Sequence, residues 1–279
     1  MTDHLQITSV QNQRVKRMVA LQQKSSERRK DGLFVVEGRR ELRHCIETGY
    51  EVESVYICPE VLREYESEEP LPTIPQGTIV YEVTSEVYEK MAYRGGTEGI
   101  MAAVRCRTQT LDGLHLPDRP LVVVLESVEK PGNVGAILRS ADAAGVDAVI
   151  VCDPRSDLYN PNLIRSSVGA FFSVPCVACR SDECIDFLKR HGIQILTAQL
   201  QDSALYYDTN MRIGTAIVMG TESTGLTTQW REAADAHIRI PMLGRVDSLN
   251  VSVSAAVLMY EAVRQRKGRP RTPSEGGGY

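Results

Sequence analysis

The sequence lacks any apolar run long enough to cross a bilayer, and its first residues lack the apolar core of a secretory signal. Both absences argue against a membrane-spanning or exported protein, so we expect a cytoplasmic one. The seven cysteines are an odd number, which without an export signal favours reduced thiols over a disulfide framework. A length of 279 residues fits one large domain or two ordinary ones.

Clustered metal ligands are missing as well. Cys176 and Cys179 form one C-x-x-C pair, but neither a second pair nor suitably spaced histidines accompany it, as a structural zinc site requires. We therefore predict no metal site and interpret the cysteines as small buried residues.

Neither of the common nucleotide-phosphate motifs is complete. The stretch from Gly220 to Thr227 nearly matches the P-loop pattern, but Leu226 stands where the phosphate-binding lysine belongs. The dinucleotide pattern G-x-G-x-x-G follows none of the expected strands. The carboxylate of Glu222, among these glycines, would also repel a phosphate. The sequence thus disfavours a nucleoside triphosphatase or a dinucleotide enzyme and favours a ligand with cationic or hydrogen-bond donor groups.

Acidic residues are in excess and give a formal net charge of −4, so the overall charge does not indicate nucleic-acid binding. The basic residues, however, are unevenly distributed along the chain. They crowd the stretch from Arg14 to Arg43, where they outnumber the acids. Such a stretch attracts phosphates and releases counterions on binding, although a solvated helix face is the plainer alternative. The predicted RNA contacts in this stretch are Arg14, Lys16, Arg28, Arg29 and Arg39.

Short apolar runs alternate with helical patterns over residues 1–110, which predicts a compact α/β domain. Gly49 suits the left-handed position that ends a helix. Expected strands are Phe34–Val36, Val52–Ile57, Ile79–Val83 and Ile100–Arg105, and expected helices are 13–24, 39–48 and Ser85–Met91. Glycine and proline interrupt a polar run at 111–119, which predicts a linker.

The pattern changes after this linker. Leu121–Leu125 is continuously apolar, as in a strand that is buried on both faces. Further strands are expected at Val146–Cys152, Phe172–Val177, Ile193–Ala198 and Ile213–Met219, with helices at Asn133–Ala144 and 250–266. This alternation predicts a mostly parallel sheet with helices on both faces. The tail, 268–279, is expected to be disordered.

Besides the glycine stretch, two segments carry polar residues beside expected strand ends. In Pro131–Arg139, Asn133 stands where a helix cap belongs, and Gly135 and Arg139 share the helix face opposite the core. Ligands bind at the carboxyl edge of such sheets, so Arg139 is a candidate functional cation, and an exposed salt bridge is the alternative. In Ile238–Ser254 a strand ends at a proline, a glycine loop follows, and Ser248 and Asn250 precede an apolar helix.

In this order and spacing, the three segments resemble the SpoU (TrmH-type) RNA 2′-O-ribose methyltransferases of the SPOUT superfamily. The motifs that carry this resemblance are NVGAILR, GTESTGL and IPM…SLNVS. The segment from Asp153 to Ala170 also resembles the conserved central segment of the family's sequences. The resemblance covers residues 120–266. The first domain is similar to the family's L30e-like substrate-binding domain through FVVEGRREL and TEGIMAAV, although Glu98 stands where relatives often have Gln.

The resemblance implies a trefoil-knotted SPOUT-type domain at 120–267, an L30e-like RNA substrate-binding domain at 1–110 and a homodimer. It also implies the cofactor S-adenosylmethionine, held in a bent form by main-chain groups of three loops. The cofactor-binding residues it implies are Ala198, Gly220, Ile240, Met242 and Leu249. The catalytic residues it implies are Asn133, Arg139, Glu222, Ser248 and Asn250, and Arg165 in the middle segment is a further RNA contact.

The implied reaction is attack of a ribose 2′-hydroxyl of RNA on the sulfonium methyl group. Ribosomal RNA is favoured over transfer RNA because the first domain resembles that of the ribosomal enzymes. An arginine has a pKa above about 12, so we interpret Arg139 first as an electrostatic clamp and only second as a base. Two rivals remain: a non-catalytic RNA-binding assembly factor of the same fold, and a nucleotide-dependent enzyme on a Rossmann-like sheet.

Overall fold

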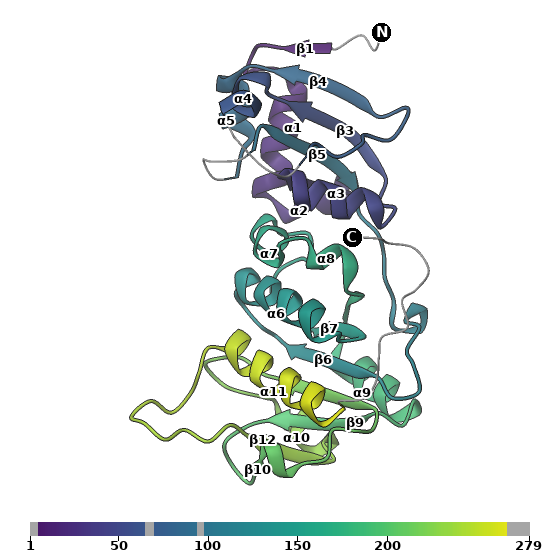
Figure 1. Cartoon of the computed structure of the whole chain (residues 1–279), viewed down its shortest axis with the longest axis vertical. Helices are drawn as coiled ribbons and strands as arrows, with labels where there is room; N and C mark the ends of the chain where they lie inside the picture. The colour runs from purple at the N-terminus through teal and green to yellow at the C-terminus, as the bar shows by residue number, and fades with distance from the viewer. Residues whose placement is uncertain (1–4, 65–69, 94–97, 267–279) are drawn as a thin grey trace.

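Two sheets organise the chain in the computed structural model, which describes residues 5–64, 70–93 and 98–266. Figure 1 shows one sheet at each end of an elongated molecule, with α6 (Pro131–Ala144), α7 (Pro161–Ser167) and α8 (Ala170–Ser173) between them. The described residues include no helix that is both long enough and apolar enough to cross a membrane.

The first sheet is mixed, with the strand order β1-β4-β3-β5-β2. Helices α1 and α5 pack on one face, and α3 packs on the other. Its strands are β1 (Leu5–Ile7), β2 (Leu33–Glu37), β3 (Val52–Ile57), β4 (Ile79–Val83) and β5 (Ile100–Arg105). Its helices are α1 (Gln13–Gln23), α2 (Ser25–Asp31), α3 (Arg39–Glu47), α4 (Pro59–Glu64) and α5 (Ser85–Met91). Every element expected here is present, whereas β1, α2 and α4 were not predicted.

The second sheet has the order β10-β12-β9-β11-β6-β7-β8, and all its pairings are parallel. Its strands are β6 (Leu121–Glu126), β7 (Ala148–Cys152), β8 (Cys176–Cys179), β9 (Gln194–Ala198), β10 (Ala204–Leu205), β11 (Thr215–Met219) and β12 (Ala236–Arg239). Its remaining elements are the helices α9 (Ser181–Arg190), α10 (Thr228–Ala233) and α11 (Val251–Gln265), with short 3₁₀ turns at Leu111–Gly113 and Tyr206–Asp208.

Strand β6 shows why both faces of this sheet need helices. Val123 and Leu125 join the apolar core under α6 and α11, whereas Val122 and Val124 join the core under α9 and α10. Successive side chains of a strand point to opposite faces, so an uninterrupted apolar run requires cover on both. The predicted α/β class, with a parallel sheet flanked by helices, is confirmed.

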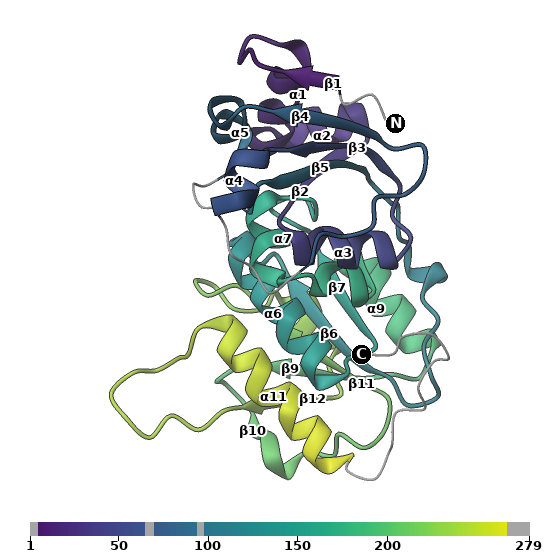
Figure 2. The same ribbon diagram turned by 45° about the horizontal axis from the view of Figure 1, so that its top comes forward.

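One apolar core continues from the first sheet into the second half of the chain. The ring of Phe34 in β2 lies 4.5 Å from that of Tyr159 and 6.3 Å from that of Phe172, measured between centroids. Figure 2 shows α7 next to the strand β2 of the first sheet. Since close-packed side chains fill the contact, the position of the first sheet relative to the second is fixed.

The strand expected at Phe172–Val177 is wrong. The structure places Phe171 and Phe172 in α8, and the strand β8 starts only after Pro175. A short apolar run cannot by itself distinguish a strand from a buried helical turn. Here Gly169, with φ +90°, turns the chain so that the ring of Phe172 contacts Phe34 and Tyr50 of the first domain, while the ring of Phe171 packs on Tyr159. The expected disordered tail, 268–279, lies outside the described residues.

Candidate cofactor and catalytic site

Loops that follow β9, β11 and β12 enclose a cavity of about 650 Å³ at the carboxyl edge of the second sheet. This is the edge at which α/β sheets bind ligands. All five predicted cofactor residues line the cavity: Ala198, Gly220, Ile240, Met242 and Leu249. Of the predicted catalytic residues, Glu222, Ser248 and Asn250 also line it.

The glycine stretch after β11 folds back on itself for a steric reason. A Cβ atom on Gly220 would lie 2.6 Å from both the carbonyl oxygen of Gly225 and the amide nitrogen of Leu226. Thr221 and Gly225 exchange backbone hydrogen bonds of 3.2 and 3.1 Å, and Gly225 has φ +69°. Only glycine allows this close approach, which leaves main-chain groups on the cavity wall.

A polar cluster closes one side of the cavity. The Glu222 carboxylate accepts hydrogen bonds from the side-chain amides of Asn133 at 3.0 Å and Asn250 at 3.2 Å. Lys130 lies 3.1 Å from its other oxygen. The hydrogen bond from Lys130 is the main cause that lowers the pKa of Glu222, so this group stays a carboxylate at neutral pH. The cluster joins the starts of α6 and α11 to the loop after β11.

Asn133 was expected to cap α6, and this is wrong. The helix begins at Pro131 with Lys130 as its N-cap, because proline favours the first helical position. Asn133 therefore sits inside the first turn, and its amide is available to Glu222. Asn250 does cap its helix: its oxygen accepts the backbone N–H of Ser252 at 2.9 Å, while its amide nitrogen donates to Glu222.

Arg139 is not among the cavity-lining residues in the described part of the chain. It is exposed, and it lies one helical turn after Gly135. A Cβ on Gly135 would come within 2.9 Å of the Ser167 backbone nitrogen, so this stripe of α6 faces α7. The structure therefore does not place Arg139 on the wall of the cofactor cavity of its own chain, and its catalytic role stays a prediction. Ser248 lines the cavity, and its hydroxyl donates a hydrogen bond of 3.4 Å to the Asp247 carboxylate.

The predicted RNA contacts fall into two groups. Arg14, Lys16, Arg29 and Arg165 are exposed.

The other two, Arg28 and Arg39, are buried, and we withdraw them as RNA contacts. Arg28 forms two bonds of 2.9 and 2.6 Å with the Asp157 carboxylate, and the backbone N–H of Arg39 donates to Glu98 at 2.8 Å. The Arg39 guanidinium also faces Glu98, at 3.9 Å. Charge counting alone could not foresee these partners, because they lie 129 and 59 residues away.

A cluster of three thiols was not predicted from the spacing of the cysteines along the sequence. The sulfur atoms of Cys152, Cys179 and Cys184 all lie within 4.8 Å of one another, whereas Cys176 is not part of this group. The register of β7 against β8 sets Cys152 opposite Cys179, and hydrogen bonds from the neighbouring thiols lower the pKa of Cys179. The absence of a metal site stays a prediction.

Comparisons with known proteins agree with these features. Residues 120–260 match the model of the SpoU rRNA Methylase family, and residues 12–102 match an MRM3-like substrate binding domain. The chain is 30% identical over 260 residues to a 23S rRNA (guanosine(2553)-2′-O)-methyltransferase, RlmP, of Bacillus subtilis, covering 91% of this chain and 98% of the relative.

A second relative, a 23S rRNA (uridine(2479)-2′-O)-methyltransferase of Streptomyces viridochromogenes, is 30% identical over 275 residues, 95% of this chain and 94% of its own. The fold is similar to the crystal structure of the SpoU methyltransferase AviRb from Streptomyces viridochromogenes with its cofactor AdoMet. The TM-score is 0.84 at 29% identity, over 93% of this chain and all of that one. The chain belongs to the SpoU rRNA methylase family.

Proposed function

We propose that this protein transfers a methyl group from S-adenosylmethionine to a ribose 2′-hydroxyl of ribosomal RNA, in the cytoplasm. The observation that carries the proposal is the cavity at the sheet edge, which gathers all five predicted cofactor residues beside the cluster of Asn133, Glu222 and Asn250. The names of the full-length relatives, both 23S rRNA 2′-O-methyltransferases, favour ribosomal over transfer RNA.

The residues of the cavity fit S-adenosylmethionine. A volume of about 650 Å³ lies in the range of small-molecule sites, and its wall combines apolar side chains such as Ile238 and Leu258 with main-chain groups. The side-chain oxygen of Gln199 is buried without a hydrogen-bond partner among the described residues, so it is free to accept from an amino or hydroxyl group. Glu222 supplies negative charge, which suits a cationic ligand.

When bound, the cofactor supplies the electrophilic methyl group. The protein then has to hold a ribose hydroxyl in line with that group and stabilise the charge that develops on its oxygen. Glu222, fixed by Asn133 and Asn250, sets the positions of two helix starts against the cavity wall. Ser248, whose hydroxyl makes a single, long hydrogen bond to Asp247 among the described residues, is available to hold the ribose.

The first domain, 1–110, is proposed to bind RNA, and the second, 120–267, to bind the cofactor, with 111–119 as a linker. The exposed side chains of Arg14, Lys16, Arg29 and Arg165 supply phosphate contacts on this proposal. Phosphate contacts position an RNA, whereas contacts with its bases select the target nucleotide.

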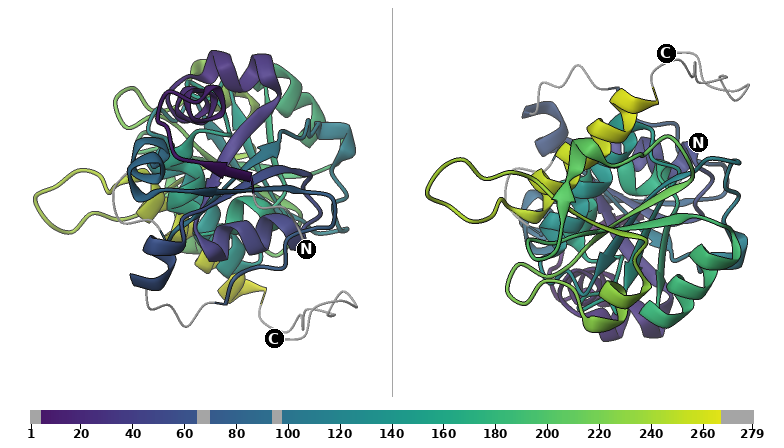
Figure 3. Two further views of the ribbon diagram at one scale, coloured as in Figure 1. Left: turned by 90° about the horizontal axis from the view of Figure 1, so that it is seen from above. Right: turned by 90° about the horizontal axis from the view of Figure 1, so that it is seen from below.

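A homodimer completes the proposal. Val253, Ala256, Val257 and Tyr260 follow one another at helical spacing on α11, and Val253 and Tyr260 are about half exposed. The loop between β12 and α11 projects from the body, and it exposes Leu243 almost completely (Figures 1 and 3). An apolar stripe of this kind needs a partner surface, and a second copy supplies one.

The first test of the dimer is to place a charge in this stripe. The variant Val253→Glu/Tyr260→Glu is expected to be a folded monomer, because two buried carboxylates would lack partners in the interface. Analytical ultracentrifugation at micromolar concentration distinguishes the two states. The control is Glu232→Ala on the distant helix α10, which should remain dimeric, and a monomeric unmodified protein would contradict the proposal.

The cofactor is tested by calorimetric titration. S-adenosylmethionine is expected to bind, and ATP and NAD are not, since the glycine stretch lacks a phosphate-binding cation. Gly220→Val should abolish binding because its side chain would collide with the backbone at Gly225. Gly244→Ala is a matched control, since a Cβ there meets nothing within 4 Å. Binding of ATP without binding of S-adenosylmethionine would refute the assignment.

A further inference from the structure

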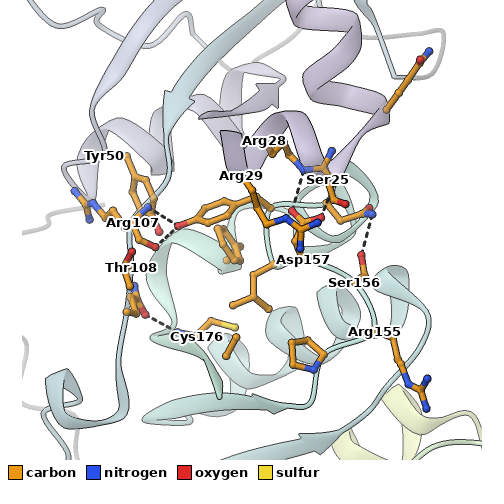
Figure 4. Close-up of a pocket in the computed structure, with 18 residues that line it drawn as sticks. Ser25, Arg28, Arg29, Tyr50, Arg107, Thr108, Arg155, Ser156, Asp157 and Cys176 are labelled. Carbon is orange, nitrogen blue, oxygen red and sulfur yellow. Dashed lines mark hydrogen bonds and ion pairs between the residues drawn. The ribbon is translucent and has the colours of Figure 1, made fainter. Parts of the chain in front are cut away.

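A second cavity, of about 680 Å³, lies between the two sheets and shares no lining residue with the cofactor cavity. Three parts of the chain wall it: α2 with the residues before it, the segment 107–109 after β5, and the loop 154–160 after β7. Figure 4 shows Arg28 and Arg29 on α2, Arg107 on one side of the cavity and Arg155 on the other. Both halves of the chain thus contribute arginines to a single cavity.

The charge of this cavity is uncompensated. Asp157 is the one carboxylate among the described lining residues, and it is already engaged by Arg28 on both oxygens. Within the ranges that the structure describes, Arg29, Arg107 and Arg155 form no ion pair. Three positive charges therefore remain around the cavity, which attracts an anion with several charges.

Arg107 is held in place by neutral groups. Its guanidinium lies 4.0 Å above the ring centroid of Tyr50 and donates to the carbonyl oxygens of Thr48, at 3.0 Å, and Gly49. Its backbone N–H and carbonyl both bond to the hydroxyl of Tyr159, at 2.6 Å. Neither a ring nor a carbonyl cancels the charge, so this cation is fixed and still available to a ligand.

The cavity is also close to the cofactor site along the sheet edge. Its loop 154–160 follows β7, whereas the stretch containing Glu222 follows β11, and only β6 separates these two strands. Two strand spacings amount to about 10 Å. A nucleic-acid strand with one ribose at the cofactor cavity could therefore place a neighbouring phosphate here.

We propose that the cavity between the two sheets binds phosphodiester groups of the substrate RNA through Arg29, Arg107 and Arg155. The proposal rests on the proposed function and adds the place where the RNA backbone is held. The hydroxyls of Ser25, Thr108 and Ser156 in the same wall are suited to phosphate and ribose oxygens. Because both halves of the chain line the cavity, the bound strand would bridge them.

The test is the double variant Arg29→Ala/Arg155→Ala, in which both changed side chains are exposed. Affinity for a ribosomal RNA fragment is expected to fall about tenfold at physiological salt. The plot of log affinity against log salt should become shallower by about 1.4, since each single-strand phosphate contact contributes about 0.7 to the slope. Affinity for S-adenosylmethionine should not change, since neither residue lines the cofactor cavity.

The matched control is Arg190→Ala/Arg212→Ala. It removes the same charge at the opposite edge of the second sheet, before β9 and β11, and should bind RNA as the unmodified protein does. The cavity proposal alone would be overturned if Arg29→Ala/Arg155→Ala kept both the RNA affinity and the salt dependence of the unmodified protein. This conclusion requires that the unmodified protein transfers methyl groups to RNA. Absence of methyl transfer by the unmodified protein would instead refute the proposed function.

Competition with inorganic phosphate shows whether the ligand of the cavity is RNA or a free anion. On the proposal, phosphate weakens RNA binding to the unmodified protein more than to Arg29→Ala/Arg155→Ala, because the variant has lost the contacts for which phosphate competes. If the variant lost phosphate binding and kept its RNA affinity, the cavity would hold a free anion, and the RNA proposal would be overturned.

Discussion

Replacing Arg139 with alanine is expected to lower the rate of methyl transfer about 10²-fold or more at saturating RNA and cofactor. A guanidinium that meets the 2′-oxygen or its neighbouring phosphate acts mainly in the transition state, and loss of such a preorganised donor has effects of this size. Affinity for S-adenosylmethionine should be unchanged, since the main-chain groups expected to hold the cofactor remain in place. Single-turnover transfer paired with cofactor titration measures both quantities.

Arg139→Lys is the conservative control, and it should also fail, because a point charge does not reproduce the planar fork of a guanidinium. Near-normal turnover in the alanine variant would reduce Arg139 to a surface residue.

In the proposed homodimer, Arg139 is expected to serve the cofactor cavity of the second subunit, because it does not line the cavity of its own chain. Mixing Arg139→Ala with Gly220→Val tests this, because only a mixed dimer combines an intact cavity with an intact arginine from the other chain. Random exchange of subunits in a two-fold dimer should then restore about a quarter of the normal activity. If the mixture stayed inactive while mixed dimers formed, the arginine would act within its own chain.

The sequence predicted those parts of the site that depend on local backbone geometry. The glycines around Glu222 were identifiable because Gly220 and Gly225 make a turn that no other residue allows, and the turn is local. The strand β11, which leads into the cavity, was predictable because an apolar run such as Ala216–Met219 requires burial on both faces.

The parts that failed depend on residues far apart in the sequence. Arg28 was taken for a surface cation because its partner Asp157 lies 129 residues away, across the contact between the two sheets. The cluster around Cys179 depends on the register of two strands, which spacing along the chain does not encode. The surroundings of Arg139 could not be predicted for a different reason: helix periodicity places it opposite the core, but it cannot tell which neighbour the exposed face meets.

The second large effect is expected from the pair that joins the two sheets. Asp157→Ala should lower the free energy of unfolding by about 3 kcal/mol, the size typical of removing one partner from a buried ion pair. Arg28 is 4% exposed at its side chain, so its charge would remain buried with only the carbonyls of Leu21 and Gln22 as partners. Urea denaturation followed by circular dichroism measures the change.

Two controls separate this effect from the loss of any surface charge. Asp182→Ala removes an exposed carboxylate that pairs with Arg180 and should leave the unfolding curve unchanged. The double variant Arg28→Met/Asp157→Leu removes both charges and should recover most of the stability lost in Asp157→Ala, since no unpaired charge stays buried. A wild-type unfolding curve for Asp157→Ala would show that water reaches Arg28.

The same pair also bears on function, because it joins the domain proposed to bind RNA to the domain that holds the cofactor cavity. Below the temperature at which Asp157→Ala unfolds, affinity for S-adenosylmethionine should be normal, since the cavity lies wholly within the second sheet and its loops. Methylation of ribosomal RNA should fall, because a loosened contact no longer aligns the ribose with the methyl group, and small misplacements lower rates strongly. If transfer stayed normal while stability fell, alignment of the substrate would depend on the second domain alone.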